Sequence, residues 1–123
     1  MTSKMYIAVL DEFPDHMTPT LVAHSVLAAH MKFEETPQPE DFLDYGIYRN
    51  PKYIDWLGNS FKKVVVRVNQ KEFDKIAALP NVHIGHEKNT LDGRNSCIVT
   101  MPYSDSEHLP NVLKFAKLWK PRE

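Results

Sequence analysis

The sequence MYIAVL (residues 5–10), followed by DEFPDHM (11–17) and TPTLVAHSVLAAHMKF (18–33), decides the fold. The first six residues are continuously apolar, which is typical of a strand covered on both faces. The next seven are mostly polar and end that strand. The last sixteen have the composition of a helix. The order strand, polar loop, helix predicts an α/β domain whose ligands bind beyond the carboxyl end of the first strand.

The predicted helix over 21–33 begins with two residues suited to a helix start. Thr18 is a good N-cap, and Pro19 fits the first helical position, where its missing N–H costs nothing. The helix is apolar over most of its circumference and is slim, because three alanines lie within it. We therefore expect it to pack against both a sheet and a neighbouring element.

The remaining elements follow in a regular order. The valine-rich segment 61–69 predicts a strand, and 70–79 predicts a short helix that Pro80 stops. Segments 82–86 and 96–101 predict two strands joined as a hairpin, since Asp92-Gly93 between them is a strong turn signal. A last helix is expected from near Pro110 to residue 119.

These elements predict a single α/β domain over residues 1–123. It would have three α/β/α layers, with a small mixed four-stranded sheet and helices on both faces. The two strand–helix–strand crossovers should each give parallel neighbours, and the hairpin adds one antiparallel strand. Residues 34–59 interrupt the pattern as an irregular, aromatic-rich insertion. Its rings either pin the insertion to the core or form a stacking or lid surface over a ligand; they are Phe42, Tyr45, Tyr48, Tyr53 and Trp56.

Composition excludes several classes of protein. The net charge is −1, from 15 basic and 16 acidic side chains, so the whole surface is not built to attract nucleic acid, although a local basic patch is compatible. No apolar run approaches the ~20 residues of a membrane span, and no signal peptide is recognisable. Cys97 has no internal disulfide partner, and its strand context favours packing over nucleophilic chemistry. We expect a cytoplasmic protein.

No sequence motif indicates a cofactor or a metal. The four glycines lack both the P-loop and the dinucleotide-binding spacing. His83 and His86 are the nearest approach to a metal pair, but residues three apart on a strand point to opposite faces. We therefore expect neither group.

Polar residues around the first strand and helix are the candidate site. His24 lies in the middle of the helix, where it is either a hydrogen-bonded core group or a base that orients water. Thr20 lies one turn earlier on the same face. Asp11 and His16 belong to the loop before the helix, where binding residues concentrate. His86, near the hairpin tip, either approaches the same crevice or faces water.

Three lysines recur along one side of the last predicted helix. Lys114, Lys117 and Lys120 are three residues apart, so they would form one basic stripe. Such a stripe is either an ordinary solvated face or a surface that contacts phosphate. In the second case, binding to nucleic acid would weaken as salt rises.

The order of elements and two local sequences resemble the peptidyl-tRNA hydrolases of the second structural class and their small uncharacterised relatives. TLVAHSVLAA (20–29) matches the family's first helix, and KFAKLW (114–119) is similar to the end of the uncharacterised relatives. The resemblance covers most of the chain except residues 34–59. It implies the family's fold and hydrolysis of the ester that joins a peptide to tRNA.

The resemblance places different side chains at the family's polar positions. Thr20 stands where the family has a lysine, His24 where it has a glutamine, and Leu27 where it has a histidine. His86 falls roughly where an aspartate is expected. A histidine can act as a general base, which a glutamine cannot. The candidate catalytic residues are thus His24, Thr20 and His86, and the candidate binding residues are Asp11, His16, Lys114, Lys117 and Lys120.

Two hypotheses follow for the function. The first is an ester hydrolase acting on peptidyl-tRNA or a related acyl-nucleotide, with His24 positioning or deprotonating water. The second is a non-catalytic regulatory module that binds a small ligand or RNA on the same scaffold, which the missing lysine and near-neutral charge favour. The partner would be tRNA or a nucleotide-like ligand, without a membrane, and a homodimer is left open.

Overall fold

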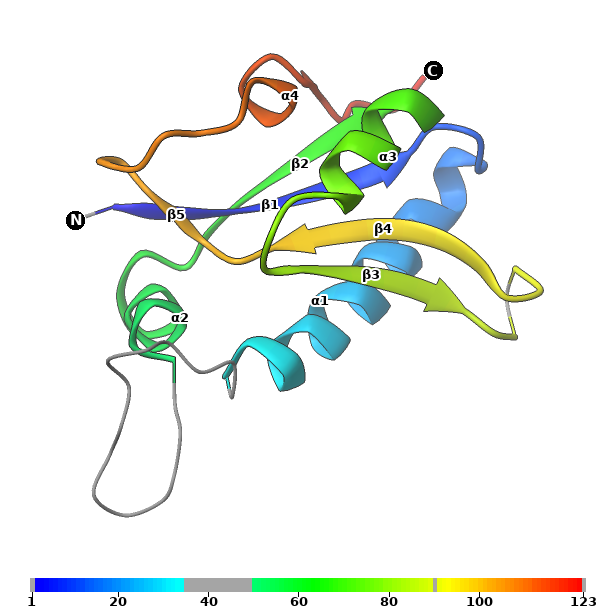
Figure 1. The fold of residues 1–123 in the computed structure, drawn as a ribbon. Helices are drawn as coiled ribbons and strands as arrows, with labels where there is room; N and C mark the ends of the chain where they lie inside the picture. The colour runs from blue at the N-terminus through cyan, green and yellow to red at the C-terminus, as the bar shows by residue number, and fades with distance from the viewer. Residues whose placement is uncertain (1, 35–49, 90, 123) are drawn as a thin grey trace.

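The first strand is the centre of the sheet. The computed structural model describes residues 2–34, 50–89 and 91–122. β1 (Ser3–Leu10) pairs in parallel with β2 (Lys62–Val68) on one side and antiparallel with β4 (Arg94–Thr100) on the other (Figure 1). Most of β1 is buried, as its continuous apolar run predicts. The parallel pairing of β1 and β2 confirms the predicted first crossover.

The described sheet is mixed, as predicted, but it has six strands rather than four. β3 (Val82–Glu87) pairs antiparallel with β4, which confirms the predicted hairpin. The second crossover was predicted wrongly, because β3 lies beside β4 at the far edge and not beside β2. Two short strands complete the sheet: β5 (Tyr103–Ser104) pairs with β1, and β6 (Lys117–Leu118) pairs with β2.

The hairpin turn follows its sequence closely. Asp92 and Gly93 have φ angles of 51° and 82°. This left-handed backbone is the conformation for which an Asp-Gly pair is favoured in hairpins. The local signal therefore predicts the geometry at this turn.

The helix α1 (Thr18–Glu34) crosses β3 and β4 (Figure 1). It buries one narrow stripe, consisting of Thr18, Leu21, Ser25, Ala29 and Phe33. We expected α1 to be buried over most of its apolar circumference. This expectation is wrong, since Leu27 and Met31 are exposed. An apolar flank of α1 is thus left without cover from the described residues.

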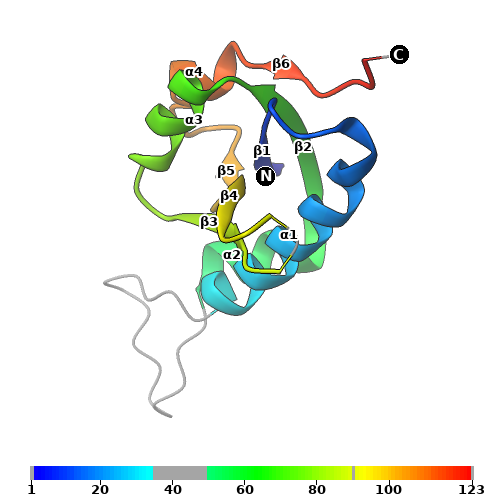
Figure 2. The same cartoon turned by 90° about the vertical axis from the view of Figure 1, so that its right-hand side faces the viewer.

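The other helices are short. A 3₁₀ turn, η1 (Asp15–Met17), precedes α1, and α3 (Gln70–Ala77) follows β2 and starts with a capping box between Asn69 and Glu72. Figure 2 shows α3 beside α4 (Asn111–Lys114), across β1 from α1. Three full layers are not confirmed, because α1 has 17 residues whereas α3 has 8 and α4 has 4.

The predicted last helix begins near Pro110 as expected, but its predicted extent to residue 119 is wrong. α4 ends at Lys114, and the chain then runs along the outer edge of the sheet, where β6 pairs with β2 (Figure 2). The backbone N–H of Trp119 donates to Val65 O at 2.9 Å and continues this contact. The predicted lysine stripe therefore does not form. Lys114 lies at the end of α4, Lys117 lies on β6, and Lys120 follows that strand.

The described part of the insertion packs against the core. α2 (Pro51–Asp55) continues into a π-helical turn, η2 (Trp56–Ser60). The side chains of Tyr53 and Trp56 are buried, which confirms the core-pinning interpretation for these two rings. Phe42, Tyr45 and Tyr48 lie outside the described residues. In the described ranges, no helix has the length and apolarity to cross a membrane.

The end of the chain is tied to the β1–α1 connection through Asp15. Its carboxylate accepts hydrogen bonds from Arg67 Nη1 at 3.0 Å and from Arg122 Nη2 at 2.7 Å. Arg122 also donates to Phe13 O at 2.9 Å. The guanidinium of Arg122, and then that of Arg67, holds the pKa of Asp15 well below its ordinary value.

We predict that Asp15→Asn loosens this connection and changes the acid sensitivity. Because the folded protein lowers the pKa of Asp15, its contribution to stability is complete above the ordinary value of about 3.9 and is lost as the pH falls below it. The melting temperature of the variant should therefore be lower at neutral pH, and the difference should shrink toward low pH. Asp105→Asn, at an exposed position, is the control. A difference that stays constant with pH would contradict the assignment.

Candidate functional site

The central contact of the site joins α1 to β3. His24 Nδ1 lies 3.0 Å from Glu87 Oε1. The histidine side chain is 54% exposed, whereas that of Glu87 is only 5% exposed. A half-exposed imidazole is thus held by a buried carboxylate at the place where α1 crosses the hairpin.

The buried carboxylate of Glu87 has more than one neighbour. Besides His24, the Ser96 hydroxyl donates to Glu87 Oε2 at a long 3.5 Å. A buried charge is costly unless it is paired, so these contacts stabilise it. When Glu87 is ionised and His24 is neutral, the carboxylate accepts a hydrogen bond from His24 Nδ1–H, and Nε2 carries the lone pair. This is the tautomer that a general base on Nε2 requires.

The pair lies at a hollow of about 160 Å³ between α1 and β3. Its lining is formed by His24, Ser25, Ala28, His83, Ile84, Gly85, His86 and Glu87. A cavity of this size holds a reacting group rather than a whole ligand, since drug-sized ligands occupy about 300–1,000 Å³. Burial, and then the nearby Lys32 ammonium, lowers the pKa of His83, which keeps that imidazole neutral at pH 7.

Gly85 allows α1 to approach β3 closely. A Cβ at this position would lie 2.2 Å from Ser25 Oγ and 3.1 Å from Ser25 Cβ. Ser25 is itself buried in the contact stripe of α1. The small residue on the strand therefore sets the distance at which His24 can reach Glu87.

We predict that Gly85→Ala destabilises the protein by about 1–3 kcal/mol, the usual cost of overpacking. The added methyl group would push α1 away from β3 or force Ser25 to turn. Chemical unfolding measures the loss. Gly58→Ala is the matched control, because nothing lies within 4 Å of a Cβ built there. Equal stability of the two variants would show that the contact is not tight.

The structure brings together only some of the predicted catalytic residues. His24 and His86 line the hollow, whereas Thr20 is exposed and does not. His86 Nδ1 lies 3.1 Å from Asn95 Oδ1, and its ring faces a second, polar cavity of about 470 Å³ as well. The side chain paired with His24 is thus that of Glu87, one residue after the predicted His86.

The predicted binding residues do not gather at the hollow. Asp11 lines a separate cavity of about 290 Å³ with Arg67, Asn69, Glu72, Phe115 and Lys117. His16 is exposed in η1. Lys114 and Lys120 are exposed on the C-terminal segment, away from the lining of the hollow.

Glu87 is the site residue that the sequence analysis missed. Alternation along a strand places residues 83, 85 and 87 on one face, and this signal was available. Nothing local indicated that α1 would cross that face at His24. The pairing therefore depends on the tertiary arrangement.

Other chemistry has less support at this site. Burial raises the pKa of Cys97 to about 11, so its thiol stays protonated in the middle of β4 and packs as an apolar group. No described group of three or more His, Cys, Asp or Glu side chains is placed to hold a metal ion.

No family model and no curated protein matches this chain. The contact between His24 and Glu87 is therefore the feature from which a function can be inferred.

Proposed function

We propose that the protein hydrolyses the ester of peptidyl-tRNA or of a related acyl-nucleotide. The observation that carries the proposal is the contact between His24 and the buried Glu87 at the mouth of a small hollow. A carboxylate that orients an imidazole is the usual arrangement of a general base. The resemblance of residues 20–29 to the first helix of the second class of peptidyl-tRNA hydrolases supports this choice of substrate, whereas residues 114–119 resemble the end of the small uncharacterised relatives.

In the proposed reaction, His24 Nε2 takes a proton from water while the water oxygen attacks the ester carbonyl carbon. The tetrahedral intermediate then collapses and the carbon–oxygen bond to the ribose breaks. The leaving ribose oxygen takes the proton back from the imidazolium, which releases the free peptide acid and the tRNA. Glu87 stabilises the transient positive charge on His24 throughout.

Phosphate contacts would come from residues around the hollow. Lys32 lies two helical turns after His24 on the same side of α1 and donates to Val82 O on β3 at 2.9 Å. Lys88 follows Glu87 directly and is exposed. These two cations take the role first assigned to the lysine stripe of the C-terminal segment. Binding of tRNA should then weaken with added salt.

Incubation of the purified protein with labelled peptidyl-tRNA tests the proposal. The expected result is multiple turnover that His24→Ala removes. His108→Ala is the matched control, because it deletes an exposed histidine that does not line the hollow. Hydrolysis no faster than in buffer, or turnover that His24→Ala leaves unchanged, would refute the proposed activity.

A second candidate is a binding module without catalysis. The exposed position of Thr20, at the place of the family's lysine, favours it because that side chain does not reach the hollow. In this case the protein would bind tRNA or a nucleotide-like ligand stoichiometrically and release it unchanged. Binding without turnover, weakened by charge removal at Lys32 or Lys88, would distinguish this function from the first.

A further inference from the structure

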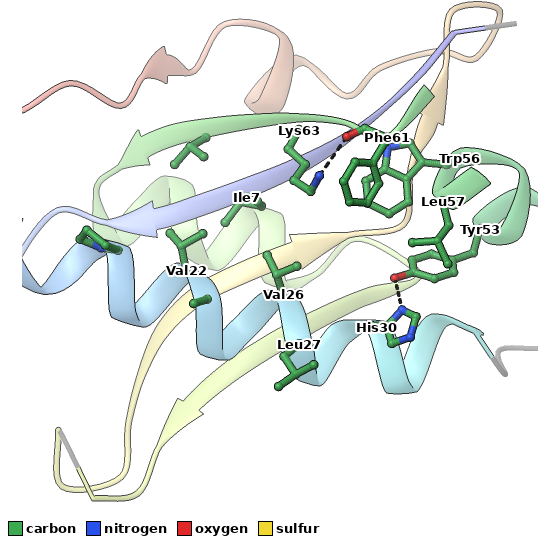
Figure 3. A pocket seen from close by; sticks show the side chains of 13 residues that line it. Ile7, Val22, Val26, Leu27, His30, Tyr53, Trp56, Leu57, Phe61 and Lys63 are labelled. Atoms are coloured by element: carbon green, nitrogen blue, oxygen red, sulfur yellow. Dashed lines mark hydrogen bonds between the residues drawn. The ribbon is translucent and has the colours of Figure 1, made fainter. Parts of the chain in front are cut away.

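An open apolar groove of about 480 Å³ lies along the flank of α1 away from His24. Figure 3 shows it between α1, the first two strands and the α2–η2 segment. Val22 and Val26 form one wall, and Ile7 and Val65 form the base. This volume is within the range of about 300–1,000 Å³ that small-molecule sites occupy.

The groove's apolar character comes from side chains that the fold leaves partly uncovered. Leu27 is 66% exposed at its rim, and Phe61 is also exposed there. Phe61 has a φ angle of 55°, in the left-handed region that is costly for a bulky residue. Such an outlier supports a functional role when it places a side chain at a site, and here it places a ring at the groove.

Lys63 is the cation at this groove (Figure 3). Its ammonium lies 3.2 Å from the centre of the Phe61 ring and donates to Phe61 O at 2.9 Å. Within residues 2–34, 50–89 and 91–122, no carboxylate forms an ion pair with it. Partial burial lowers the pKa of Lys63.

His30, the other titratable side chain of the lining, is already engaged. Its Nδ1 lies 2.9 Å from the Tyr53 hydroxyl oxygen, and its Nε2 lies 3.4 Å from Glu34 Oε2. Burial raises the pKa of Tyr53 to about 12, so this hydroxyl keeps its proton and remains a donor. His30 therefore closes one part of the groove, and an anionic group would be bound at Lys63.

We propose that the groove binds a small apolar monocarboxylate, such as a medium-chain fatty acid, with its carboxylate on Lys63 and its hydrocarbon body along Val22 and Val26. None of the described residues that line the groove is acidic, so these residues do not repel an anion. A single lysine suits a monoanion, because phosphate groups are usually held by several donors or by a bidentate arginine. The site is separate from the hollow at His24 and does not depend on the proposed hydrolysis.

Titration with decanoate, followed by isothermal calorimetry and by amide chemical shifts, tests this proposal. We expect saturable binding with shifts confined to the groove, and weaker binding of decanol. Lys63→Met keeps the side-chain stem and should weaken decanoate binding about tenfold or more, as for loss of a hydrogen bond to a charged group. It should leave decanol binding unchanged. Lys62→Met is the matched control, since Lys62 precedes it on β2 and does not line the groove.

Leu27→Glu should abolish the binding of both probes without unfolding the protein, because the changed side chain is exposed. Equal affinity of the wild type for decanoate and decanol would overturn the proposal, as would binding that Lys63→Met does not change. Absence of binding up to the solubility of decanoate would also overturn it. A concentration-dependent dimer that Leu27→Glu dissociates would assign the groove to a second copy of the chain instead.

Discussion

Replacing Glu87 with glutamine is expected to lower kcat/KM for peptidyl-tRNA about 10²–10⁴-fold, the usual contribution of general-base catalysis. The amide keeps the shape of the carboxylate but can present its NH₂ group to His24 Nδ1. This change favours the wrong tautomer and removes the charge that stabilises the imidazolium. The measurement is single-turnover hydrolysis by a variant whose circular dichroism spectrum matches that of the wild type.

The combination with His24→Ala decides whether the two residues act together. If they form one unit, the double variant should be no slower than His24→Ala alone. Ser96→Ala is a milder control, since its hydroxyl reaches Glu87 only at 3.5 Å. Full activity of Glu87→Gln, with activity lost in His24→Ala, would show that the carboxylate has no part in the chemistry.

Replacing Trp56 with alanine is expected to cost about 3–5 kcal/mol of unfolding free energy. The side chain is 1% exposed, and its indole N–H donates to Lys62 O at 2.8 Å. It also packs against the rings of Tyr53 and Phe61, with centroid distances of 5.5 and 5.3 Å. Because domains are stable by only about 5–15 kcal/mol, this loss removes a large part of the total.

Urea unfolding measures the effect of Trp56→Ala. Trp56→Phe is the matched variant, since it keeps a ring in the core and loses the hydrogen bond. It should therefore cost less than the alanine substitution. A loss below about 1 kcal/mol for Trp56→Ala would mean that the site collapses without a cavity, contrary to the packing described.

The elements with strong local signals were predicted from the sequence. The apolar run of β1, the valines of β2 and the Asp92-Gly93 turn each specify a backbone conformation through nearby residues alone. The parallel pairing of β1 with β2 followed from the helical crossover that connects them. These parts of the fold could therefore be predicted without knowledge of the tertiary structure.

The end of the chain could not be predicted in this way. Spacing of three residues between Lys114, Lys117 and Lys120 favours a helix, but the open edge of β2 offers unpaired backbone groups. Pairing of β6 with that edge satisfies them and ends α4 at Lys114. Whether these residues extend α4 or pair with β2 depends on contacts between distant parts of the chain. Local periodicity therefore does not predict the outcome.

The site was predicted in part for a similar reason. His24 was recognised because a polar residue interrupts an apolar helix, and the structure places it at a hollow. His86 was chosen instead of Glu87 because of its place near the hairpin tip and its alignment with a resembling family, and not because of the strand face on which it lies. The crossing of α1 over β3, which Gly85 permits, determines which side chain His24 meets.

The tautomer of His24 tests the central claim most directly, and ¹⁵N NMR of the imidazole measures it. The spectrum is recorded at a pH high enough for the neutral imidazole to be observed. The account predicts a hydrogen on Nδ1, bonded to Glu87, and a bare Nε2, with this preference lost in Glu87→Gln. A hydrogen mainly on Nε2 in the wild type would contradict a base held by Glu87.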